Sequence, residues 1–258
     1  MDIITSNSNK IVKHVRALHT KKGRTTAGAF LVEGAKFVGE IAPPWEIEFI
    51  AASQSFAKSH GLKTYGNTHT YIVADHIFTT MCDAVTPQGI LAVVKQRTFG
   101  VSDVLQNQNP LLLILDEIND PGNLGAMLRI AHGLGLCGVI LSENCADVYN
   151  PKVVRSSAGS VFHAPFAVAP LPEAVAHLKA RNITVFAACA SAENSLYNLD
   201  FRGPSAILIG NEARGLRDNA LQRVDEHVKI PIVSESLNAS VACGILAYEA
   251  FRQRCNTL

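Results

Sequence analysis

The stretch "LILDEINDPGNLGAMLRIAHGLGL", residues 113–136, joins an apolar run to an amphipathic run through the turn "DPGN". The apolar run predicts a buried strand, and the spacing of apolar residues after the turn predicts a helix. A strand, a glycine turn and a helix also make up the common phosphate-binding loops. Neither standard loop is present here. Gly122 and Gly125 have the wrong spacing for a dinucleotide fold, and the chain contains no G-x-x-x-x-G-K-[ST] run.

Two polar residues of this stretch remain as candidates for a binding site. Asn123 and Arg129 lie in the first turns of the predicted helix, where the helix dipole favours an anion. The plain alternative is a helix-capping asparagine followed by a surface arginine. The stretch taken alone leaves both interpretations open.

From Pro110 onward, apolar strands alternate with helical stretches. Strands that are apolar on both faces and are separated by helices predict an α/β fold with a parallel sheet covered on both sides. The last stretch predicts a long helix, because Ser236 and Asn238 can cap its start and Arg252 and Arg254 complement its end. The strands are expected in "LLLILDEI", "CGVILSE", "VFHAPFAVA", "ITVFAACA", "SAILIGNE" and "HVKIPIV".

The first hundred residues read as a smaller α/β unit. A helix is expected over residues 5–22, and strands are expected in "GAFLVE", "IEFIAAS" and "QGILAVVKQ". Residues 97–110 are polar and end in Asn-Pro, which predicts a linker with one helical turn. We therefore expect two domains, at about residues 1–98 and about 105–258.

Charge is distributed unevenly although the net charge is only +1. Residues 1–100 hold 11 basic and 7 acidic residues, whereas residues 101–258 hold 12 and 15. The amino-terminal 24 residues carry six basic residues against one acid, which is either a solvated helix face or a surface that contacts a phosphate backbone. The residues expected to contact RNA on this arm are Lys21, Lys22 and Arg24.

Several classes of protein are disfavoured by the sequence. The six cysteines form no CxxC pair, so we expect reduced, mostly buried thiols in a cytosolic protein without a zinc or other metal site. The amino terminus has no apolar signal-peptide region. Apolar runs are too short to span a bilayer, so no membrane association is expected.

Two further polar clusters follow predicted strands. In "ILIGNEARGL", residues 207–216, a strand runs into Gly210, Asn211, Glu212 and Gly215, at a place where open α/β sheets bind ligands. A simple β-turn is the alternative. In "IPIVSESLNASVACGILAYE", residues 230–249, polar residues open a helix rich in small side chains. Plain helix capping is the alternative there.

The three clusters occur together and in this order, and in this arrangement the sequence resembles the SpoU family of RNA 2′-O-ribose methyltransferases, within the SPOUT superfamily. "VVRSSAGSVFHAPF" (153–166), "FLVEGAKFV" (30–38) and "TPQGILAVV" (86–94) are also similar to that family. The resemblance covers nearly the whole chain, and the combination of motifs is specific although each one alone is weak.

The resemblance implies a parallel-sheet methyltransferase domain whose carboxyl-terminal segment forms a deep trefoil knot, a rare exception to ordinary chain connectivity. It also implies S-adenosylmethionine as the cofactor and a homodimer with the active site near the subunit interface. The first domain resembles the substrate-binding domain of rRNA-modifying members, so the implied substrate is 23S-type rRNA rather than tRNA.

The resemblance assigns residue roles as well. The implied catalytic residues are Asn123, Arg129, Glu212, Ser236 and Asn238. The implied cofactor-binding residues are Gly210, Asn211, Gly215, Ile230 and Leu237. Arg129 is also expected to contact RNA, since an arginine is normally always protonated and is suited to a phosphate.

This sequence departs from the family pattern in two places. Ala213 replaces a usual glycine, and alanine would be strained if that position needed a positive φ. The loop over residues 230–236 is about two residues shorter than usual. Both departures argue for the alternative function, an RNA-binding or ribosome-assembly factor with little or no methyl transfer. The presence of the five implied catalytic residues argues against it and favours the methyltransferase. A nicotinamide-dependent dehydrogenase fails on the missing fingerprint.

Overall fold

The protein is described by a computed structural model that covers residues 3–61, 68–233 and 236–255. These residues belong to two compact units. Unit 1 comprises residues up to Arg97 together with Asp147–Phe162, and unit 2 comprises Thr98–Ala146 and the residues from His163 onward. The segment 147–162 therefore packs with unit 1, although the sequence groups it with the second predicted domain.

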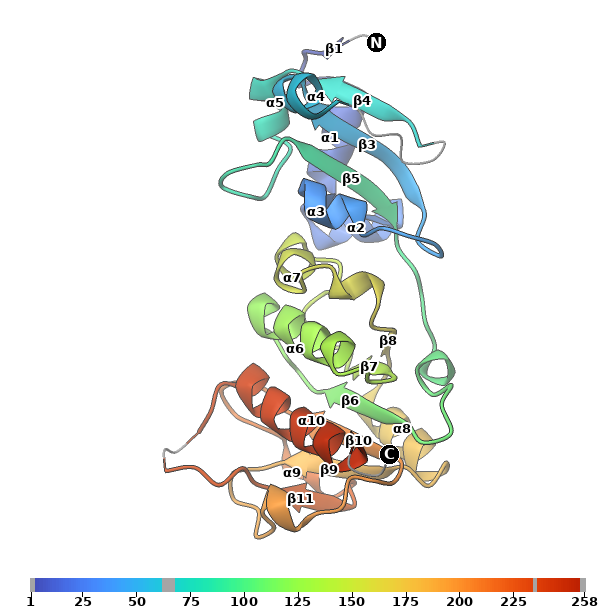
Figure 1. Cartoon of the computed structure of the whole chain (residues 1–258), viewed down its shortest axis with the longest axis vertical. Helices are drawn as coiled ribbons and strands as arrows, with labels where there is room; N and C mark the ends of the chain where they lie inside the picture. Colours follow the sequence, from blue (N-terminus) through green and yellow to red (C-terminus); the bar gives the residue numbers. More distant parts are fainter. Residues whose placement is uncertain (1–2, 62–67, 234–235, 256–258) are drawn as a thin grey trace. The chain divides into compact units, whose positions relative to one another are not determined.

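Unit 1 contains a mixed five-stranded sheet with the strand order β1-β4-β3-β5-β2 (Figure 1). Strands β1, β4 and β3 run parallel, whereas β5 is antiparallel to both β3 and β2. The three longer strands coincide with the expected apolar runs. The strands are β1 (Ile3–Ile4), β2 (Ala29–Glu33), β3 (Ile47–Ser53), β4 (Thr70–Val73) and β5 (Ile90–Lys95).

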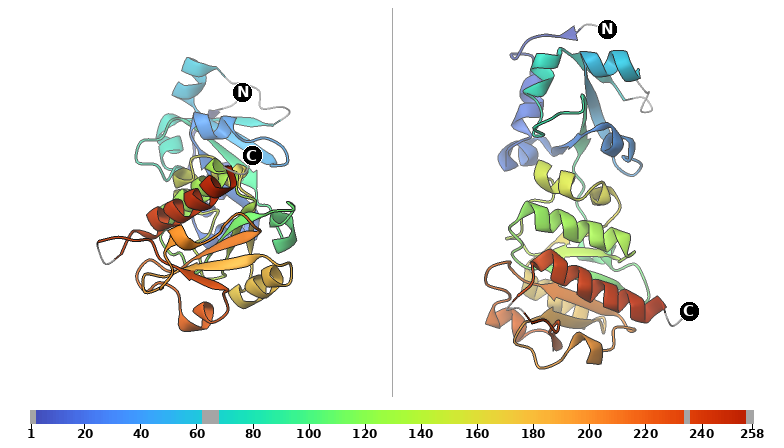
Figure 2. Two further views of the ribbon diagram at one scale, coloured as in Figure 1. Left: turned by 60° about the horizontal axis from the view of Figure 1, so that its bottom comes forward. Right: turned by 60° about the vertical axis from the view of Figure 1, so that its left-hand side comes forward.

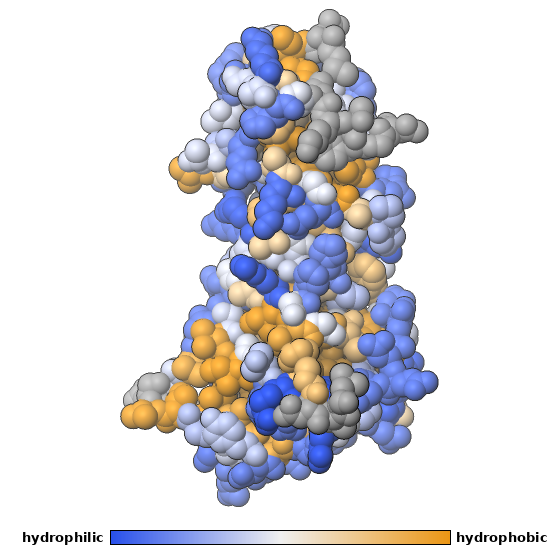
Figure 3. Space-filling view, viewed as in Figure 1, coloured by the Kyte–Doolittle hydropathy of each residue, from blue (hydrophilic) through white to orange (hydrophobic). Residues whose placement is uncertain are grey.

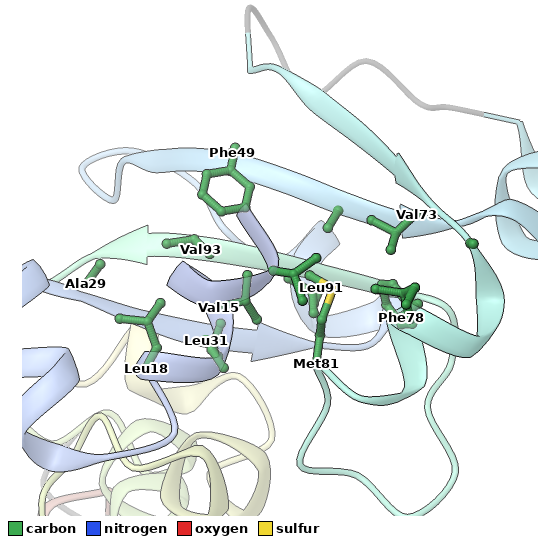
Figure 4. Close-up of a cluster of buried hydrophobic side chains, with 14 residues drawn as sticks. Val15, Leu18, Ala29, Leu31, Phe49, Val73, Phe78, Met81, Leu91 and Val93 are labelled. Carbon is green, nitrogen blue, oxygen red and sulfur yellow. The ribbon is translucent and has the colours of Figure 1, made fainter. Parts of the chain in front are cut away.

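Short helices cover this sheet, and α1 contributes apolar side chains to the core. Val15 and Leu18 pack from the α1 side against Leu31, Leu91 and Val93 of the sheet (Figure 4). The single helix expected over residues 5–22 is wrong, because the Thr20 hydroxyl accepts from the Gly23 amide and starts a second helix. The helices are α1 (Lys10–Ala17), α2 (Lys21–Ala27), α3 (Ala35–Gly39), α4 (Gln54–His60), α5 (Asp75–Thr79), α7 (Pro151–Ser156) and the 3-10 turn η2 (Ser160–Phe162).

Unit 2 contains a six-stranded sheet in which every pairing is parallel, with the order β11-β9-β10-β6-β7-β8. This confirms the predicted α/β fold with a parallel sheet. The carboxyl ends of all six strands consequently meet at one edge, which we call the carboxyl edge. The strands are β6 (Leu111–Leu115), β7 (Gly138–Leu141), β8 (Phe166–Val168), β9 (Thr184–Ala188), β10 (Ser205–Ile209) and β11 (Glu226–Val228).

Helices cover both faces of this sheet. Val175 and Leu178 of α8 pack against Leu112, Ile114 and Leu208, which alternate with the residues that point to the other face. On that other face α10 lies alongside α6 in all views (Figures 1 and 2). The remaining elements are η1 (Val101–Val104), α6 (Pro121–Gly133), α8 (Leu171–Lys179), η3 (Leu196–Asn198), α9 (Asp218–Leu221) and α10 (Ala239–Cys255).

Two of the expected strands are shorter than the sequence indicated. Val161 and Phe162 lie in the turn η2, so only Phe166–Val168 of "VFHAPFAVA" is a strand. In "HVKIPIV" the strand ends at Val228, before Pro231, whose ring cannot donate to a ladder. The expected linker contains its predicted turn, η1.

The cysteine prediction is partly wrong. All six cysteines are free, as expected, but only Cys243 is buried, while four are partly buried and Cys255 is exposed. Among the described residues, no helix is both long and apolar enough to cross a bilayer. The described part of the chain also holds no group of three or more His, Cys, Asp or Glu residues placed to bind a metal ion.

Candidate active site

The turn "DPGN" is the start of helix α6. The Asp120 carboxylate accepts a hydrogen bond from the Asn123 backbone N–H at 2.8 Å, and Pro121 occupies the first helical turn, where its missing N–H costs nothing. The helix is therefore capped by Asp120 and not by Asn123. This leaves the Asn123 carboxamide available for contacts beyond its own helix.

The loop after β10, residues 210–217, is closed by its own backbone and by one side chain. The Asn211 carboxamide oxygen accepts from the Ala213 backbone N–H at 3.0 Å, and the Gly215 N–H donates to the Asn211 carbonyl at 2.9 Å. A Cβ on Gly210 would lie 2.6 Å from Gly215 C, so the glycine admits the returning loop. We expected instead that it admits a ligand.

The strain expected at Ala213 does not occur. The positive φ of this loop falls on Gly215, at +68°, and Ala213 is not among the residues with a positive φ. Gly215 is the residue type that adopts this conformation without a penalty. The replacement of glycine by Ala213 is thus compatible with the loop as it folds.

Glu212 joins this loop to the start of α6. Its carboxylate accepts from the backbone N–H groups of Asn119 at 3.3 Å and Asp120 at 3.0 Å, and from the Asn123 carboxamide at 3.2 Å. Partial burial by itself raises the pKa of Glu212. Hydrogen bonds from its own backbone N–H, from Asp120 and from Asn123 outweigh this, so the pKa lies below its ordinary value. Glu212 is therefore ionised at neutral pH.

Asn238, which belongs to the third polar cluster of the sequence, is hydrogen-bonded to Asn123. Its carboxamide nitrogen donates to the Asn123 carboxamide oxygen at 3.0 Å, while its own oxygen accepts from the Ser240 backbone N–H at 2.9 Å and caps α10. Glu212, Asn123 and Asn238 consequently form one hydrogen-bonded chain. Three sequence-predicted residues from three separate motifs are thus brought together at the carboxyl edge of the sheet.

A cavity of about 140 Å³ lies beside this chain of hydrogen bonds, at the carboxyl ends of β9 and β11. Leu237, which lines it, is the sequence neighbour of Asn238. Its walls are mainly apolar or small, which suits a flat apolar group such as the adenine of a nucleoside. Its lining residues are Ala188, Cys189, Ala190, Val228, Ile230, Ile232, Ser236, Leu237 and Ala242.

Only some of the sequence-predicted cofactor residues line this cavity. Ile230 and Leu237 line it, and so does Ser236, which was expected in the catalytic set. Gly210, Asn211 and Gly215 are not among its lining residues and act in the loop that carries Glu212. The contribution of residues 188–190 was missed. Their place after an apolar strand in a predicted parallel sheet was the available signal.

Arg129 lies apart from these contacts. Its side chain is exposed on α6, and six residues along a helix correspond to a rise of about 9 Å from Asn123. Within the described residues, no hydrogen bond joins Arg129 to Glu212, Asn123 or Asn238. An exposed, permanently charged guanidinium at this distance can reach a group outside the protein.

Only some of the basic side chains predicted to contact RNA are exposed to solvent. Lys21 and Lys22 are exposed on α2. Arg24 is only 2% exposed, pairs with Asp147 at 2.6 Å and donates to the carbonyls of Leu18 and His19. The expectation that Arg24 contacts RNA is corrected, because its donors are used inside unit 1.

Comparison with known proteins gives a consistent result. Residues 110–248 match the family model described as "SpoU rRNA Methylase family", and residues 9–92 match one described as "MRM3-like substrate binding domain". The chain is 34% identical to the 23S rRNA (guanosine(2553)-2'-O)-methyltransferase of Bacillus subtilis, over 96% of this chain and 98% of the relative. It is 30% identical to the 23S rRNA (uridine(2479)-2'-O)-methyltransferase of Streptomyces viridochromogenes, over 97% and 92%.

A solved structure is similar along the whole chain. The AdoMet-bound rRNA methyltransferase of Sinorhizobium meliloti superposes with a TM-score of 0.88 at 28% identity, covering 97% of each chain. Both units of the chain therefore have counterparts in that structure.

Proposed function

Since this chain belongs to the SpoU rRNA methylase family, we propose that it transfers the methyl group of S-adenosylmethionine to a ribose 2′-hydroxyl of RNA. One observation carries the proposal. The hydrogen-bonded chain of Glu212, Asn123 and Asn238 lies beside an apolar cavity, with Leu237 and Asn238 adjacent in sequence. Polar side chains that can form hydrogen bonds with a ribose hydroxyl are therefore adjacent to a cavity that suits an adenosyl group.

The cofactor is proposed to bind in the cavity lined by Ile230 and Leu237. Its positive sulfonium would supply an electrophilic methyl group. The main task of the protein is then to place the ribose 2′-oxygen in line with that group. The apolar side chains of Ile230, Leu237 and Val228 would exclude water from an adenine ring. The related Sinorhizobium meliloti structure holds AdoMet, which supports the same ligand here.

The polar chain is proposed to hold the ribose. Glu212 accepts hydrogen bonds from Asn119, Asp120 and Asn123 and has a lowered pKa, so its carboxylate is a weak base and serves better to orient donors than to remove a proton. Asn123 and Asn238 present amide groups to the hydroxyl, and Ser236 adds a hydroxyl at the cavity. In-line placement of the 2′-oxygen then supplies most of the rate enhancement.

Arg129 is proposed to bind the phosphate next to the target ribose. A guanidinium stays protonated, so it is poorly suited to act as a base. Bound S-adenosylmethionine would supply the electrophilic methyl group, and Arg129 would orient the RNA for the transfer rather than accept the proton of the 2′-hydroxyl. The exposed position of Arg129 on α6 suits contact with an RNA phosphate.

The proposed substrate is 23S-type rRNA rather than tRNA. The relatives from Bacillus subtilis and Streptomyces viridochromogenes are 23S rRNA methyltransferases, and both are covered almost completely by this chain. Residues 9–92 match a substrate-binding domain, and the exposed Lys21 and Lys22 of unit 1 are proposed to contact RNA phosphates. A cytoplasmic location follows from this substrate.

A homodimer is proposed from the outer face of α10. Val241, Ile245 and Tyr248 recur at helical spacing and are exposed, and hydrophobic residues gather over α10 in the space-filling view (Figure 3). The trefoil knot is a proposal as well. It is supported by the path of the chain from the edge strand β11 to α10 beside α6.

The alternative function is an RNA-binding factor with little methyl transfer. Strain at Ala213 was one of two observations in its favour, and Ala213 is unstrained. The other, the short 230–236 loop, includes positions 234–235, which lie outside the described residues.

Calorimetry with S-adenosylmethionine tests the cofactor, and Arg129→Ala separates binding from chemistry. We expect Arg129→Ala to bind the cofactor like the wild type and to lose methyl transfer to rRNA from a strain that lacks this gene. Absence of cofactor binding by the folded wild-type protein would refute the enzyme assignment. Equal loss of binding and transfer in Arg129→Ala would make Arg129 structural.

A further inference from the structure

Glu117 combines two properties that are unfavourable for a glutamate. It follows β6 directly after Asp116 and has a φ of +56°, in the left-handed region that disfavours residues other than glycine. Its side chain is also buried, with the residue only 6% exposed. A charged residue in a strained backbone conformation persists only where surrounding contacts hold it.

Those contacts come mainly from the loop after β10, with others from the residues that follow β7. Arg217 pairs with Glu117 Oε1 at 2.6 Å, and Arg214 donates to Oε2. Asn144 donates to Oε1 at 3.4 Å. Burial raises the pKa of Glu117, but the hydrogen bond and charge of Arg214 and the charge of Arg217 outweigh it and lower the pKa, so the group is ionised at neutral pH.

The backbone of Glu117 is held as well. Its carbonyl accepts from the Asn211 carboxamide nitrogen at 2.8 Å, and its N–H donates to the Ser142 hydroxyl at 2.9 Å. Glu117 therefore binds the 210–217 loop through Asn211, Arg214 and Arg217. These three residues stand on both sides of Glu212.

We propose that Glu117 is a positioning residue for methyl transfer, which fixes the 210–217 loop so that the Glu212 carboxylate meets the start of α6. Through Glu212 it would set the orientation of Asn123 and, beyond it, Asn238. This inference rests on the proposed function for its kinetic consequence. Its structural consequence, the order of the loop, is independent of that function.

The exposure of the arginines separates this role from ordinary stabilisation. The side chains of Arg214 and Arg217 are 57% and 54% exposed, so water solvates them when the carboxylate is removed. No buried charge is left without a partner. Glycine at position 117 would also adopt the positive φ without strain. Glu117→Gly is therefore expected to preserve or raise stability while it loosens the loop.

The experiment compares wild type, Glu117→Gly and Glu117→Gln in methyl transfer from radiolabelled S-adenosylmethionine to rRNA from a strain that lacks this gene. In both variants kcat should fall about ten- to a hundredfold, as small misplacements of reacting groups do. The Kd for S-adenosylmethionine should stay within about twofold, because Glu117 does not line the cavity. The Tm of Glu117→Gly should equal or exceed that of the wild type.

Arg223→Gln is the matched control. Arg223 is an exposed arginine that lines the same hollow as Glu117 and Arg217. Its described hydrogen bonds use its backbone: its N–H donates to the Ala220 carbonyl, and its carbonyl accepts from Lys179. Its kcat should equal that of the wild type. An unchanged kcat in Glu117→Gly, or a joint loss of kcat, cofactor affinity and Tm, would overturn the positioning role.

Hydrogen exchange keeps the test separate from the proposed function. If the wild type transfers no methyl group, the function fails, but the loop can still be examined. Glu117→Gly should then speed exchange of the Asn119 and Asp120 amides, which donate to Glu212. Unchanged exchange at these amides would overturn the proposal.

Discussion

The two units each contain an arginine–carboxylate cluster, and the buried partner differs between them. In unit 1 the buried member is Arg24, and the more accessible Asp147 pairs with it. In unit 2 the buried member is the Glu117 carboxylate, and the half-exposed Arg214 and Arg217 pair with it. Loss of Asp147 leaves the buried Arg24 guanidinium without its carboxylate, whereas loss of Glu117 leaves only two half-exposed arginines that water can solvate. The arrangement thus predicts which substitutions affect folding and which affect only the site.

The largest effect is expected at Asp147. Asp147→Ala leaves the Arg24 guanidinium buried with only the carbonyls of Leu18 and His19, so the free energy of unfolding should fall by about 3 kcal/mol. Urea denaturation measures this. Asp200→Ala, which removes an exposed pair with Arg202, should leave stability unchanged. Equal effects of the two substitutions would remove the distinction between buried and exposed pairs.

A smaller effect is expected from acidification of unit 2. The folded pKa of Glu117 lies below its ordinary value of 4.5, because Arg214 and Arg217 stabilise the carboxylate. Its stabilising contribution is therefore complete above that value and is lost as the pH falls through the folded pKa. Urea midpoints measured from about pH 7 to about pH 3 should fall less steeply in Glu117→Gln than in the wild type. Parallel curves would show that Glu117 contributes nothing to the acid response.

The smallest effect on folding is expected at the exposed end of α2. Neutralising Lys21 and Lys22 should leave stability unchanged but weaken RNA binding, and reduce the salt dependence of log K by about one for each lost phosphate contact. Arg24→Gln on the same helix provides the contrast in RNA binding: its donors are used inside unit 1, so the salt slope should stay that of the wild type. An unchanged salt slope would make the two lysines a solvated surface only.

The parallel sheet was predictable because its strands are apolar on both faces and are separated by helical stretches. The site was predictable in part. Glu212, Asn123 and Asn238 each follow a strand or open a helix, so a parallel sheet necessarily gathers them at its carboxyl edge. The sequence could not show which atoms bind one another, and it therefore misjudged the reason for Gly210.

Two features could not be read from the sequence because they depend on contacts distant along the chain. Arg24 is separated by 123 residues from Asp147, so its burial leaves no local signal beside the exposed Lys21 and Lys22. Glu117 reads as an ordinary polar residue at the end of a strand. Only the folded chain shows its positive φ and the two arginines, 97 and 100 positions later, that surround its carboxylate.

The capping of α10 by Asn238 has a consequence for synthesis of the protein. The same carboxamide that starts this helix also reaches Asn123, so docking of the last helix and completion of the polar chain are a single event. A nascent chain that has not yet exposed residue 238 lacks this part of the site, whatever else has folded. The proposed site is therefore complete only after synthesis has passed residue 238.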